Sequence, residues 1–408
     1  MPNEFSTPSK PNPALAATPR RRLVLGGIAS LGALQRLPAA ALAAGLLCTG
    51  RARGAAAPQA RTFVQGLQQP WGLAFLPDAR LLLTQKGGTM VIASADGRTL
   101  SAPLADVPAV APSGQGGLLD VCLDPDFERE PWVYISYAEP GSGTEAGKAG
   151  TAVARGRLRG NALHDVNVIF RQLPKVPGSG HFGCRLVFGR DKTLFATLGE
   201  RQLKTPAQDL QTHLGKVVRI QRDGKAAPDN PALQSSGKRA LPEIWSYGHR
   251  NPQGAALHPR SGELWLTEHG PQGGDELNIA RAAKNYGWPE RSYGCNYGSF
   301  MSGCEIGNGR HAPDFVEPLT TWVPRSIGPS GLCFYDSPLI PQWRGNLFVG
   351  ALAGRALWRL TLDGDTVVQR EALFDSLQER IRDVRQGPDG ALYLLTDNSD
   401  GRVLRIAP

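Results

Sequence analysis

The stretch DVRQGPDGALYLLT, residues 383–396, contains the structural unit that repeats along this chain. A short strand-like segment at 383–386 is followed by the turn residues Pro388, Asp389 and Gly390 and then by large residues over 392–396. Two such segments joined by Pro and Gly are typical of two strands with a tight turn between them. The stretch therefore predicts a β-hairpin.

The same unit occurs five more times before it. The paired segments are 72–76 with 81–85, 118–123 with 133–137, 185–188 with 194–198, 255–257 with 264–267, and 332–335 with 347–350. A single hairpin is marginally stable, so six similar hairpins must bury their faces on one another. Radial stacking does this and leaves only short edges. We predict an all-β fold, a six-bladed β-propeller of four-stranded antiparallel blades over 58–408; a β-sandwich would not explain six copies.

The charge of the chain is concentrated at its start. There are 45 Lys and Arg against 36 Asp and Glu, a formal net charge of +9. Residues 1–57 hold seven basic residues and one acid, which accounts for +6 and leaves about +3 for the rest. A nearly neutral body disfavours nucleic acid as a partner.

Residues 1–57 also have the features of an export leader. Arginines at 20–22 precede the apolar, small-residue segment 23–29. Adjacent arginines in this position are typical of the twin-arginine route, which carries folded proteins. Arg36 interrupts the apolar stretch, which disfavours a stable membrane span. We expect a cleaved signal, with 55–57 as one candidate cleavage site, and a periplasmic protein.

Polar residues occupy positions that a propeller would bring together. Since the innermost strands run in the same sense, the residues just before them meet at one mouth of the central channel. The residues at these positions, or at strand exits on the same face, are Gln115, His181, Glu200, Arg250, Asn251, His269, Arg380 and Arg382. Buried arginines require an acidic ligand, and a histidine kept neutral beside them is suited to general-base catalysis.

Two loops carry further chemistry. The loop 270–278, GPQGGDELN, is rich in glycine and acidic residues, and carbonyl and carboxylate oxygens are the ligands that Ca²⁺ prefers. Cys295 and Cys304 flank a Gly-rich loop. In an oxidising compartment they are candidates for a disulfide, and two free thiols are the alternative.

Five motifs in order resemble a known family. They are GHFGCRL (180–186), SYGHRNPQG (246–254), EHGPQGGDELN (268–278), NYGWP (285–289) and RIRDV (380–384). Together they resemble the soluble aldose sugar dehydrogenases that use pyrroloquinoline quinone (PQQ), from about Gly66 to Ile406. The resemblance implies oxidation of an aldose at the anomeric carbon to a lactone, with PQQ and Ca²⁺ as cofactors, an external electron acceptor, and a monomer or homodimer.

The resemblance also implies residue roles. His181 matches the general base and Glu200 the carboxylate that orients it. The positions that match cofactor contacts are Gln115, Arg250, Asn251, Tyr297, Ala351, Ala353, Arg380 and Arg382. The positions that match calcium ligands are the backbones of Gly270 and Pro271 at the cofactor, with Glu276 and Tyr286 at a second site.

The chain departs from the family pattern in two places. The family has a lysine against the cofactor where this chain has Ala353, and Arg355 is the nearest cation in sequence. Cys184 replaces a glycine near His181. Two alternatives stay open: a calcium-dependent propeller hydrolase of the lactonase type, which has no need of clustered arginines, and a non-catalytic binding propeller, which the missing lysine favours.

Overall fold

The structure is a computed structural model that describes residues 57–235, 237–299 and 301–408. The predicted export leader, 1–57, lies outside the described residues apart from Ala57. None of the helices in the described residues is long and apolar enough to cross a membrane. The only helices described are four single turns, namely η1 (Gly143–Glu145), η2 (Thr205–Gln208), η3 (Pro341–Trp343) and η4 (Asp375–Leu377).

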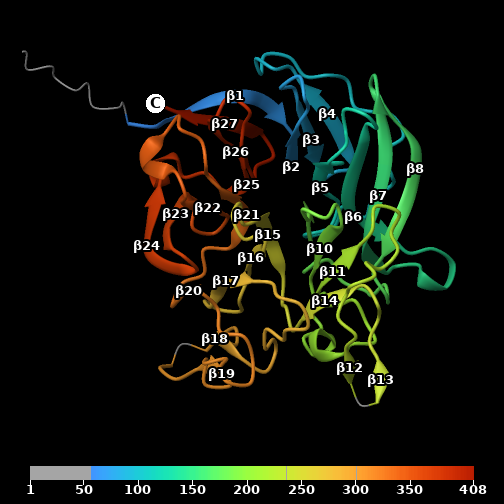
Figure 1. Ribbon diagram of the computed structural model, residues 1–408, viewed down its shortest axis with the longest axis vertical. Coiled ribbons are helices and arrows are strands. Elements are labelled where there is room, and N and C mark those ends of the chain that lie inside the picture. Colours follow the sequence, from blue (N-terminus) through green and yellow to red (C-terminus); the bar gives the residue numbers. More distant parts are fainter. Residues whose placement is uncertain (1–56, 236, 300) are drawn as a thin grey trace, which may run out of the picture. The chain divides into compact units, whose positions relative to one another are not determined.

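The predicted six-bladed β-propeller is confirmed (Figure 1). Each blade is an antiparallel sheet whose strands follow one another outward from the central channel. From the innermost strand outward, blades 1 to 3 are β2 (Pro70–Phe75), β3 (Leu81–Gln85) and β4 (Thr89–Ala93); β5 (Leu118–Leu123), β6 (Trp132–Pro140), β7 (Ala149–Arg159) and β8 (Ala162–Arg171); and β9 (Gly183–Phe188), β10 (Leu194–Leu198), β11 (Lys216–Ile220) and β14 (Ile244–Tyr247). Blades 4 to 6 are β15 (Pro252–Leu257), β16 (Leu264–Glu268), β17 (Asp275–Ile279) and β20 (Thr320–Trp322); β21 (Pro329–Phe334), β22 (Leu347–Ala351), β23 (Ala356–Asp363) and β24 (Thr366–Leu373); and β25 (Ile381–Gln386), β26 (Leu392–Thr396), β27 (Gly401–Ala407) and β1 (Gln59–Leu67).

The blades form a closed ring. The innermost strands contact one another in the order β2, β5, β9, β15, β21 and β25, and β25 contacts β2 again. Blade 1 has three regular strands, and a less regular segment hydrogen bonds along its outer edge, from Ser101 N to Ile92 O (2.8 Å) and Leu104 N to Met90 O (2.8 Å). In blade 6 the outermost strand, β1, is the first strand of the chain, so the two ends of the propeller sequence close the ring together.

The third residue of each innermost strand faces a neighbouring blade. These residues are, in ring order, Gly72, Asp120, Arg185, Gly254, Gly331 and Asp383. A Cβ added at Gly72 would lie 2.9 Å from Oδ1 of Asp120, and one at Gly331 would lie 2.4 Å from Oδ1 of Asp383. Glycine at 72 and 331 therefore leaves room for the charged side chains of Asp120 and Asp383, which approach Arg185.

Those charged side chains form a buried ion network. Nη1 of Arg185 lies 2.8 Å from Asp120 and 3.1 Å from Asp383, and Arg385 contacts the same two carboxylates at 3.1 and 3.0 Å. The two acids balance the two arginines, which is the condition for burying such charges. The network ties blades 2, 3 and 6 together and fills the interior below the candidate site.

Every innermost strand also has a bulge near its start. The register with the second strand shifts within the first few residues in all six blades, as between Pro252 and Gly254 or between Ile381 and Asp383. A bulge re-aims side chains and is common beside active sites. Here the bulge lets the adjacent residues Arg382 and Asp383 contact different partners. Arg382 donates to Gln253, and Asp383 pairs with Arg185.

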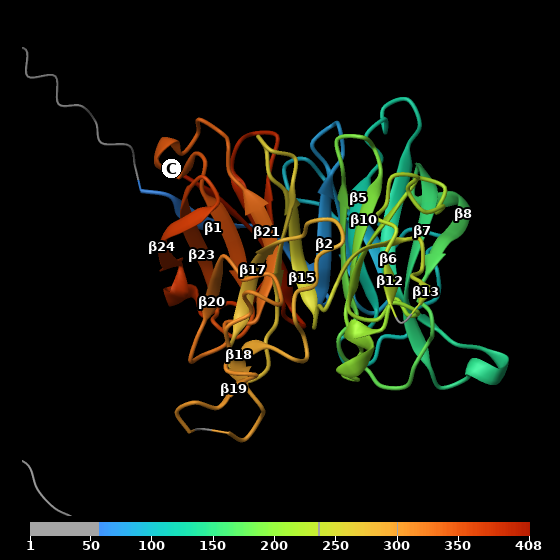
Figure 2. The same cartoon turned by 60° about the horizontal axis from the view of Figure 1, so that its bottom comes forward.

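Apolar side chains from neighbouring blades pack between the sheets. One cluster joins blades 1 and 2 through residues such as Leu82 and Ile135, and another joins blades 5 and 6 through Phe348 and Leu394. Two small hairpins, β12 (Gln234–Ser235) with β13 (Lys238–Arg239) and β18 (Ser292–Cys295) with β19 (Glu305–Ile306), are insertions in blades 3 and 4. The β18–β19 hairpin projects beyond the blades (Figure 2).

Candidate active site

Residues just before the innermost strands meet at one end of the ring. Oε1 of Gln115 accepts hydrogen bonds from the backbone N–H of His181 (2.9 Å) and from Nδ2 of Asn251 (3.3 Å). Oδ1 of Asn251 accepts one from the N–H of Gly183 (3.1 Å). These bonds join blades 2, 3 and 4. We call this end the axial mouth, defined by Gln115, His181, Arg250, Asn251, Arg380 and Arg382.

His181 lies in the axial mouth with one ring nitrogen held by a carboxylate. Its Nδ1 lies 2.7 Å from Oε1 of Glu200, which is fully buried. A carboxylate only accepts hydrogen bonds, so Nδ1 carries the proton and Nε2 keeps its lone pair. Burial, the largest influence, lowers the pKa of His181 although Glu200 raises it, and the nearby charge of Arg250 lowers it further. The imidazole is therefore neutral near pH 7, with Nε2 available as a base.

His269 is a second imidazole at the mouth, and it is differently arranged. Its Nε2 donates to the carbonyl of Pro329 (2.8 Å), and its Nδ1 lies 3.4 Å from Nδ2 of Asn251. Burial, reinforced by Arg250, lowers its pKa to about 3. Both ring nitrogens of His269 are engaged, whereas Nε2 of His181 makes no hydrogen bond within the described residues. His181 is thus the better base of the two.

The backbone around His181 is conformationally unusual. The φ angles of His181, Gly183 and Cys184 are +51°, +67° and +91°, in the region that favours glycine. Such backbone clusters at functional sites, where the surroundings must hold it. Cys184 is fully buried with its Sγ 3.1 Å from the carbonyl of Phe182, and burial raises the pKa of its thiol to about 12. Cys184 is therefore a packed, protonated thiol.

Arg201 holds this backbone in place. It donates from Nε to the carbonyl of Gly180 (2.8 Å), from Nη1 to that of Ala149 (2.7 Å), and from Nη2 to that of Gly178. Its guanidinium also lies 3.7 Å from the ring centre of Phe182. Arg201 was not among the residues predicted from the sequence, although it directly follows Glu200.

Arg250 faces the same space as His181. It donates to the carbonyl of His269 (3.0 Å) and to the hydroxyl of Tyr297 (3.2 Å), and its guanidinium lies 5.2 Å from the ring centre of Trp288. Its Nε is buried and, among the described residues, has no hydrogen-bond partner. A buried donor without a partner is costly, so this nitrogen is suited to receive a ligand acceptor.

Arg380 and Arg382 share one carboxylate. Oδ2 of Asp397 lies 2.7 Å from Nη2 of Arg380, and its Oδ1 lies 2.9 Å from Nη2 of Arg382. Arg382 also donates to Oε1 of Gln253 (2.7 Å). Burial raises the pKa of Asp397, but the charges and hydrogen bonds of Arg382 and Arg380 together lower it to below its ordinary value. Asp397, which follows β26 directly, was missed in the sequence, and it neutralises only half of the positive charge beside it.

Two cavities open at the axial mouth. The first has a volume of about 370 Å³ and is lined by His181, Glu200, Gln202, Lys204, Arg250, Pro271, Trp288, Asn296 and Tyr297. The second has a volume of about 420 Å³ and is lined by Gln69, Trp71, Lys86, Gly114, Gln115, Gln253, Arg380, Arg382, Asp397, Asn398 and Ser399. The hydrogen bond from His181 to Gln115 joins their walls. The mouth therefore has one side that carries the imidazole of His181 and another side that is strongly cationic.

The glycine-rich loop after β16 lies beside the first cavity. Asp275 holds it, because its carboxylate accepts hydrogen bonds from the N–H groups of Gly270 (2.9 Å), Ile327 (2.7 Å) and Gly328 (2.9 Å). Asp275 is therefore a structural anchor of the loop that we expected to bind Ca²⁺. Within the described residues, the carbonyl oxygens of Gly270 and Pro271 accept no hydrogen bond.

Glu276 and Tyr286 line a small space behind this loop. Glu276 pairs across the strands with Glu268 and accepts a hydrogen bond from Nδ2 of Asn278 (3.0 Å). Burial, with the charge of Glu268 next, raises the pKa of Glu276 well above its usual range. The hydroxyl of Tyr286 is bonded to the backbone of Ile279, which leaves its carbonyl as a potential ligand. Among the described residues no group of three or more His, Cys, Asp or Glu forms a metal-binding cluster.

Ala351 and Ala353 lie on the fifth blade. Ala351 is fully buried in an apolar cluster, and neither alanine lines the two cavities. Ala353 is exposed, and its N–H donates to the carbonyl of Ile327 (2.8 Å). Arg355 is exposed as well and lines neither cavity. This flank of the mouth therefore lacks the positive charge that the resemblance implies there.

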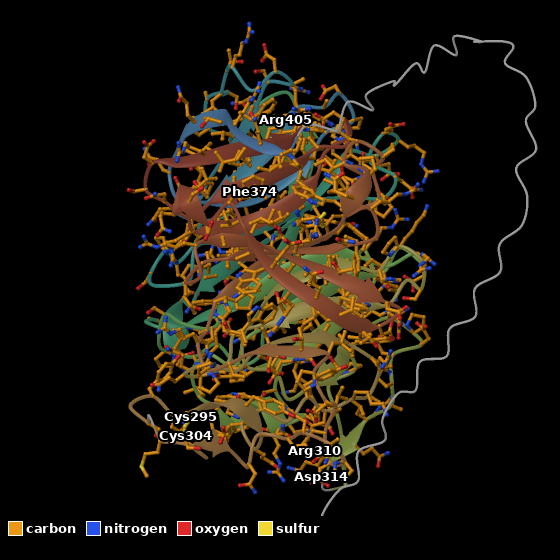
Figure 3. All side chains as sticks on the ribbon, turned by 90° about the vertical axis from the view of Figure 1, so that its left-hand side faces the viewer. Cys295, Cys304, Arg310, Asp314, Phe374 and Arg405 are labelled. Carbon is orange, nitrogen blue, oxygen red and sulfur yellow. A yellow bond between two sulfur atoms is a disulfide. The ribbon has the colours of Figure 1, made fainter. Side chains whose placement is uncertain are left out.

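Tyr297 belongs to a loop closed by a disulfide. Cys295 and Cys304 are bonded, with Cα atoms 5.2 Å apart, so the free-thiol alternative is wrong (Figure 3). The backbone of Cys295 pairs with that of Gln272 in the glycine-rich loop, at 3.0 and 2.9 Å. Tyr297 is 73% exposed, and its hydroxyl contacts Arg250. The disulfide loop thus borders the first cavity.

Known proteins share this architecture. The model of the glucose/sorbosone dehydrogenase family matches residues 67–405. The chain belongs to this family. The family match spans all six blades, from the end of β1 to β27.

Individual relatives cover most of the chain. Aldose sugar dehydrogenase YliI of Escherichia coli (strain K12) is 46% identical over 345 residues, which cover 84% of this chain and 91% of that protein. A glucose dehydrogenase known from a crystal structure is 49% identical in sequence and has a TM-score of 0.80. The match covers 86% of this chain and 99% of that chain. The structure of the PQQ-bound aldose sugar dehydrogenase of Streptomyces coelicolor is 30% identical in sequence and has a TM-score of 0.68. The match covers 86% of this chain and 98% of that chain.

Proposed function

We propose that this protein is a PQQ-dependent aldose sugar dehydrogenase that oxidises the anomeric carbon of an aldose to a lactone. The observation that carries the proposal is a buried, neutral His181 whose free Nε2 shares one mouth with three arginines and only one neutralising carboxylate. The family membership and the PQQ-bound relative from Streptomyces coelicolor support PQQ as the cofactor.

The residues at the mouth fit a multiply anionic cofactor. PQQ carries three carboxylates, and guanidinium groups bind carboxylates through paired, charge-assisted hydrogen bonds. Arg250, Arg380 and Arg382 would hold it, with Gln115 and Asn251 as neutral partners. The unpartnered Nε of Arg250 and the incomplete neutralisation of Arg380 and Arg382 by Asp397 support this assignment.

The residues also fit calcium. The carbonyl oxygens of Gly270 and Pro271 accept no hydrogen bond within the described residues, and carbonyl oxygen is a preferred ligand of Ca²⁺. We assign these two to an ion at the cofactor. Glu276 and the carbonyl of Tyr286 would hold a second ion behind the loop, where a divalent cation would offset the burial of Glu276 beside Glu268.

The chemistry divides between the cofactor and the protein. When bound, PQQ supplies a quinone that accepts a hydride, and Ca²⁺ on it increases its electrophilicity. Nε2 of His181 accepts the proton of the anomeric hydroxyl, so that the sugar loses one hydride and one proton and becomes a lactone. Glu200 stabilises the imidazolium that this transfer creates and keeps Nε2 pointed into the cavity.

The surroundings suit a sugar substrate in an exported enzyme. Trp288 and Tyr297 give the cavity of His181 two aromatic walls, and Lys204 and Asn296 add polar groups. The Cys295–Cys304 disulfide and the basic, apolar leader support export to the periplasm, by the twin-arginine route. An external acceptor must then remove the two electrons.

Reconstitution tests the proposal directly. Purified protein is incubated with PQQ and Ca²⁺, and glucose and a redox dye are added. Dye reduction that depends on both PQQ and sugar is expected. Lactone opening without PQQ would identify a hydrolase instead, and PQQ binding without turnover on a panel of aldoses would identify a binding protein.

A further inference from the structure

Lys86 lies on the cationic side of the mouth, on the first blade. It is the first residue after β3, and its backbone is held by bonds from its N–H to the carbonyl of Gln69 (2.9 Å) and from the N–H of Leu118 to its carbonyl (3.0 Å). A Cβ on Gly117 would lie 2.7 Å from Cγ of Lys86. The glycine at 117 thus leaves room for the aliphatic part of the Lys86 side chain beside the mouth.

The side chain of Lys86 reaches the arginine cluster of the sixth blade. Lys86 lines the cavity of about 420 Å³ together with Arg380, Arg382 and Asp397. Its burial lowers the pKa of the ammonium group, the charge of Asp397 opposes this, and that of Arg382 adds to it. Within the described residues, no carboxylate oxygen lies within 4.0 Å of its Nζ.

The cavity therefore holds three cations and one carboxylate. Asp397 is already shared by Arg380 and Arg382 at 2.7 and 2.9 Å, so it does not also pair with Lys86. A half-buried ammonium without a counter-ion is unfavourable, and a ligand carboxylate would relieve it. The excess positive charge thus lies on the side of the mouth that faces blade 1.

The ring order gives Lys86 a particular place. Blade 6, with the two arginines, lies between blade 1 and blade 5. On blade 5, next to the Leu352 carbonyl that accepts a bond from Arg380 (3.2 Å), stands Ala353, which carries no charge. Lys86 lies on the opposite flank of the same arginines.

We propose that Lys86 binds a carboxylate of the anionic cofactor and supplies, from blade 1, the positive charge that Ala353 does not supply from blade 5. This inference rests on the proposed function, because it concerns how PQQ is held. It assigns Lys86 a binding role only. Proton transfer stays with His181.

The test measures binding rather than turnover. PQQ is titrated into the full chain with Ca²⁺ present, and Kd is followed by quenching of tryptophan fluorescence, since Trp71 lines the same cavity. Lys86→Gln and Lys86→Met, which keep most of the stem, are expected to raise Kd roughly tenfold or more, the effect of losing one charge-assisted hydrogen bond. Lys86→Arg should stay within about threefold of the wild-type Kd, and the melting temperature of each apoprotein reports folding.

Lys225→Gln is the matched control, since Lys225 is exposed, pairs with Asp223 and does not line this cavity. Its Kd should equal that of the wild type. If the wild type binds PQQ and both neutral Lys86 variants bind it equally well, the role of Lys86 is refuted and the proposed function stands. If the wild type binds no PQQ, the proposed function fails and this inference fails with it.

Discussion

Nδ1 of His181 lies 2.7 Å from Oε1 of Glu200, and the two residues come from opposite arms of one hairpin. His181 precedes β9 and Glu200 follows β10, the paired inner strands of blade 3. The base and the group that orients it are therefore positioned by the same hairpin. Neighbouring blades add support, because the N–H of His181 donates to Gln115 (2.9 Å) and the N–H of Glu200 donates to the carbonyl of Arg250 (3.0 Å).

Replacing His181 by alanine should stop turnover without preventing cofactor binding. A positioned general base contributes about 10²–10⁴-fold to rate, so kcat should fall by at least 10²-fold. Stopped-flow dye reduction and a PQQ titration measure the two effects separately. His164→Ala, at an exposed histidine on β8, is the control. Near-normal kcat in His181→Ala would assign the base to another residue.

Replacing Glu200 by glutamine should change the pH profile as well as the rate. In the wild type, burial places the pKa of His181 below the ordinary value of 6.5, so the acid limb of kcat/KM should lie below pH 6.5. Glu200 raises that pKa, so its neutral replacement should shift the limb to lower pH while kcat falls roughly 10- to 100-fold. A limb that moves to higher pH would contradict this electrostatic role.

Replacing Asp397 by asparagine should destabilise the apoprotein more than it destabilises the protein with bound PQQ. The change leaves Arg380 and Arg382 without their shared carboxylate, which should cost the apoprotein roughly 2–3 kcal/mol. Bound PQQ would supply carboxylates in its place, so the rise in melting temperature on adding PQQ should be larger than in the wild type. An equal rise in both proteins would mean that PQQ does not contact these arginines.

Removing the disulfide should weaken the binding of the sugar more than it destabilises the fold. Cys295→Ser/Cys304→Ser frees the loop that carries Tyr297, while the blades pack without it. We expect KM for the sugar to rise several-fold with a smaller change in kcat and in melting temperature. Tyr297→Phe removes only the hydroxyl contact with Arg250 and separates that contact from loop order. Unchanged KM in the double serine variant would show that the disulfide does not shape the substrate cavity.

Calcium should stabilise the protein in the absence of PQQ. A ligand present at 100 times its Kd adds about 2.7 kcal/mol to the native state, which corresponds to a rise of a few degrees in melting temperature. The Glu276→Gln variant should lose much of this rise, because Glu276 is the one carboxylate that we assign to an ion. Scanning calorimetry with Ca²⁺ and with a chelator gives both values, and identical melting curves for the wild type would rule out the site at Glu276.

The six blades could be predicted from the sequence because the turn residues between the two strands of each inner hairpin, such as 388–390, are recognisable without knowledge of the rest of the fold. The place of β1 was not predicted, since its partner β27 is far away in sequence and neither strand carries a signal for the other. The residues of the mouth were predictable because six equivalent positions converge in a ring. Asp397 and Lys86 follow their second strands directly and were missed, because single charged residues after strands are common and only the packed ring brings these two to the arginines.

The pairing of β1 with β27 has a consequence for how the protein is made. The register places Gln59 opposite Ala407, so the last blade is complete only when both ends of the propeller sequence are present. The ribosome must therefore release almost the whole chain before the ring can close and the mouth can retain a ligand. Any protease that trims the N-terminus must stop before Gln59, because removing β1 would leave β27 as the unpaired outer edge of blade 6 and would uncover the apolar cluster in which Val64 and Leu67 pack.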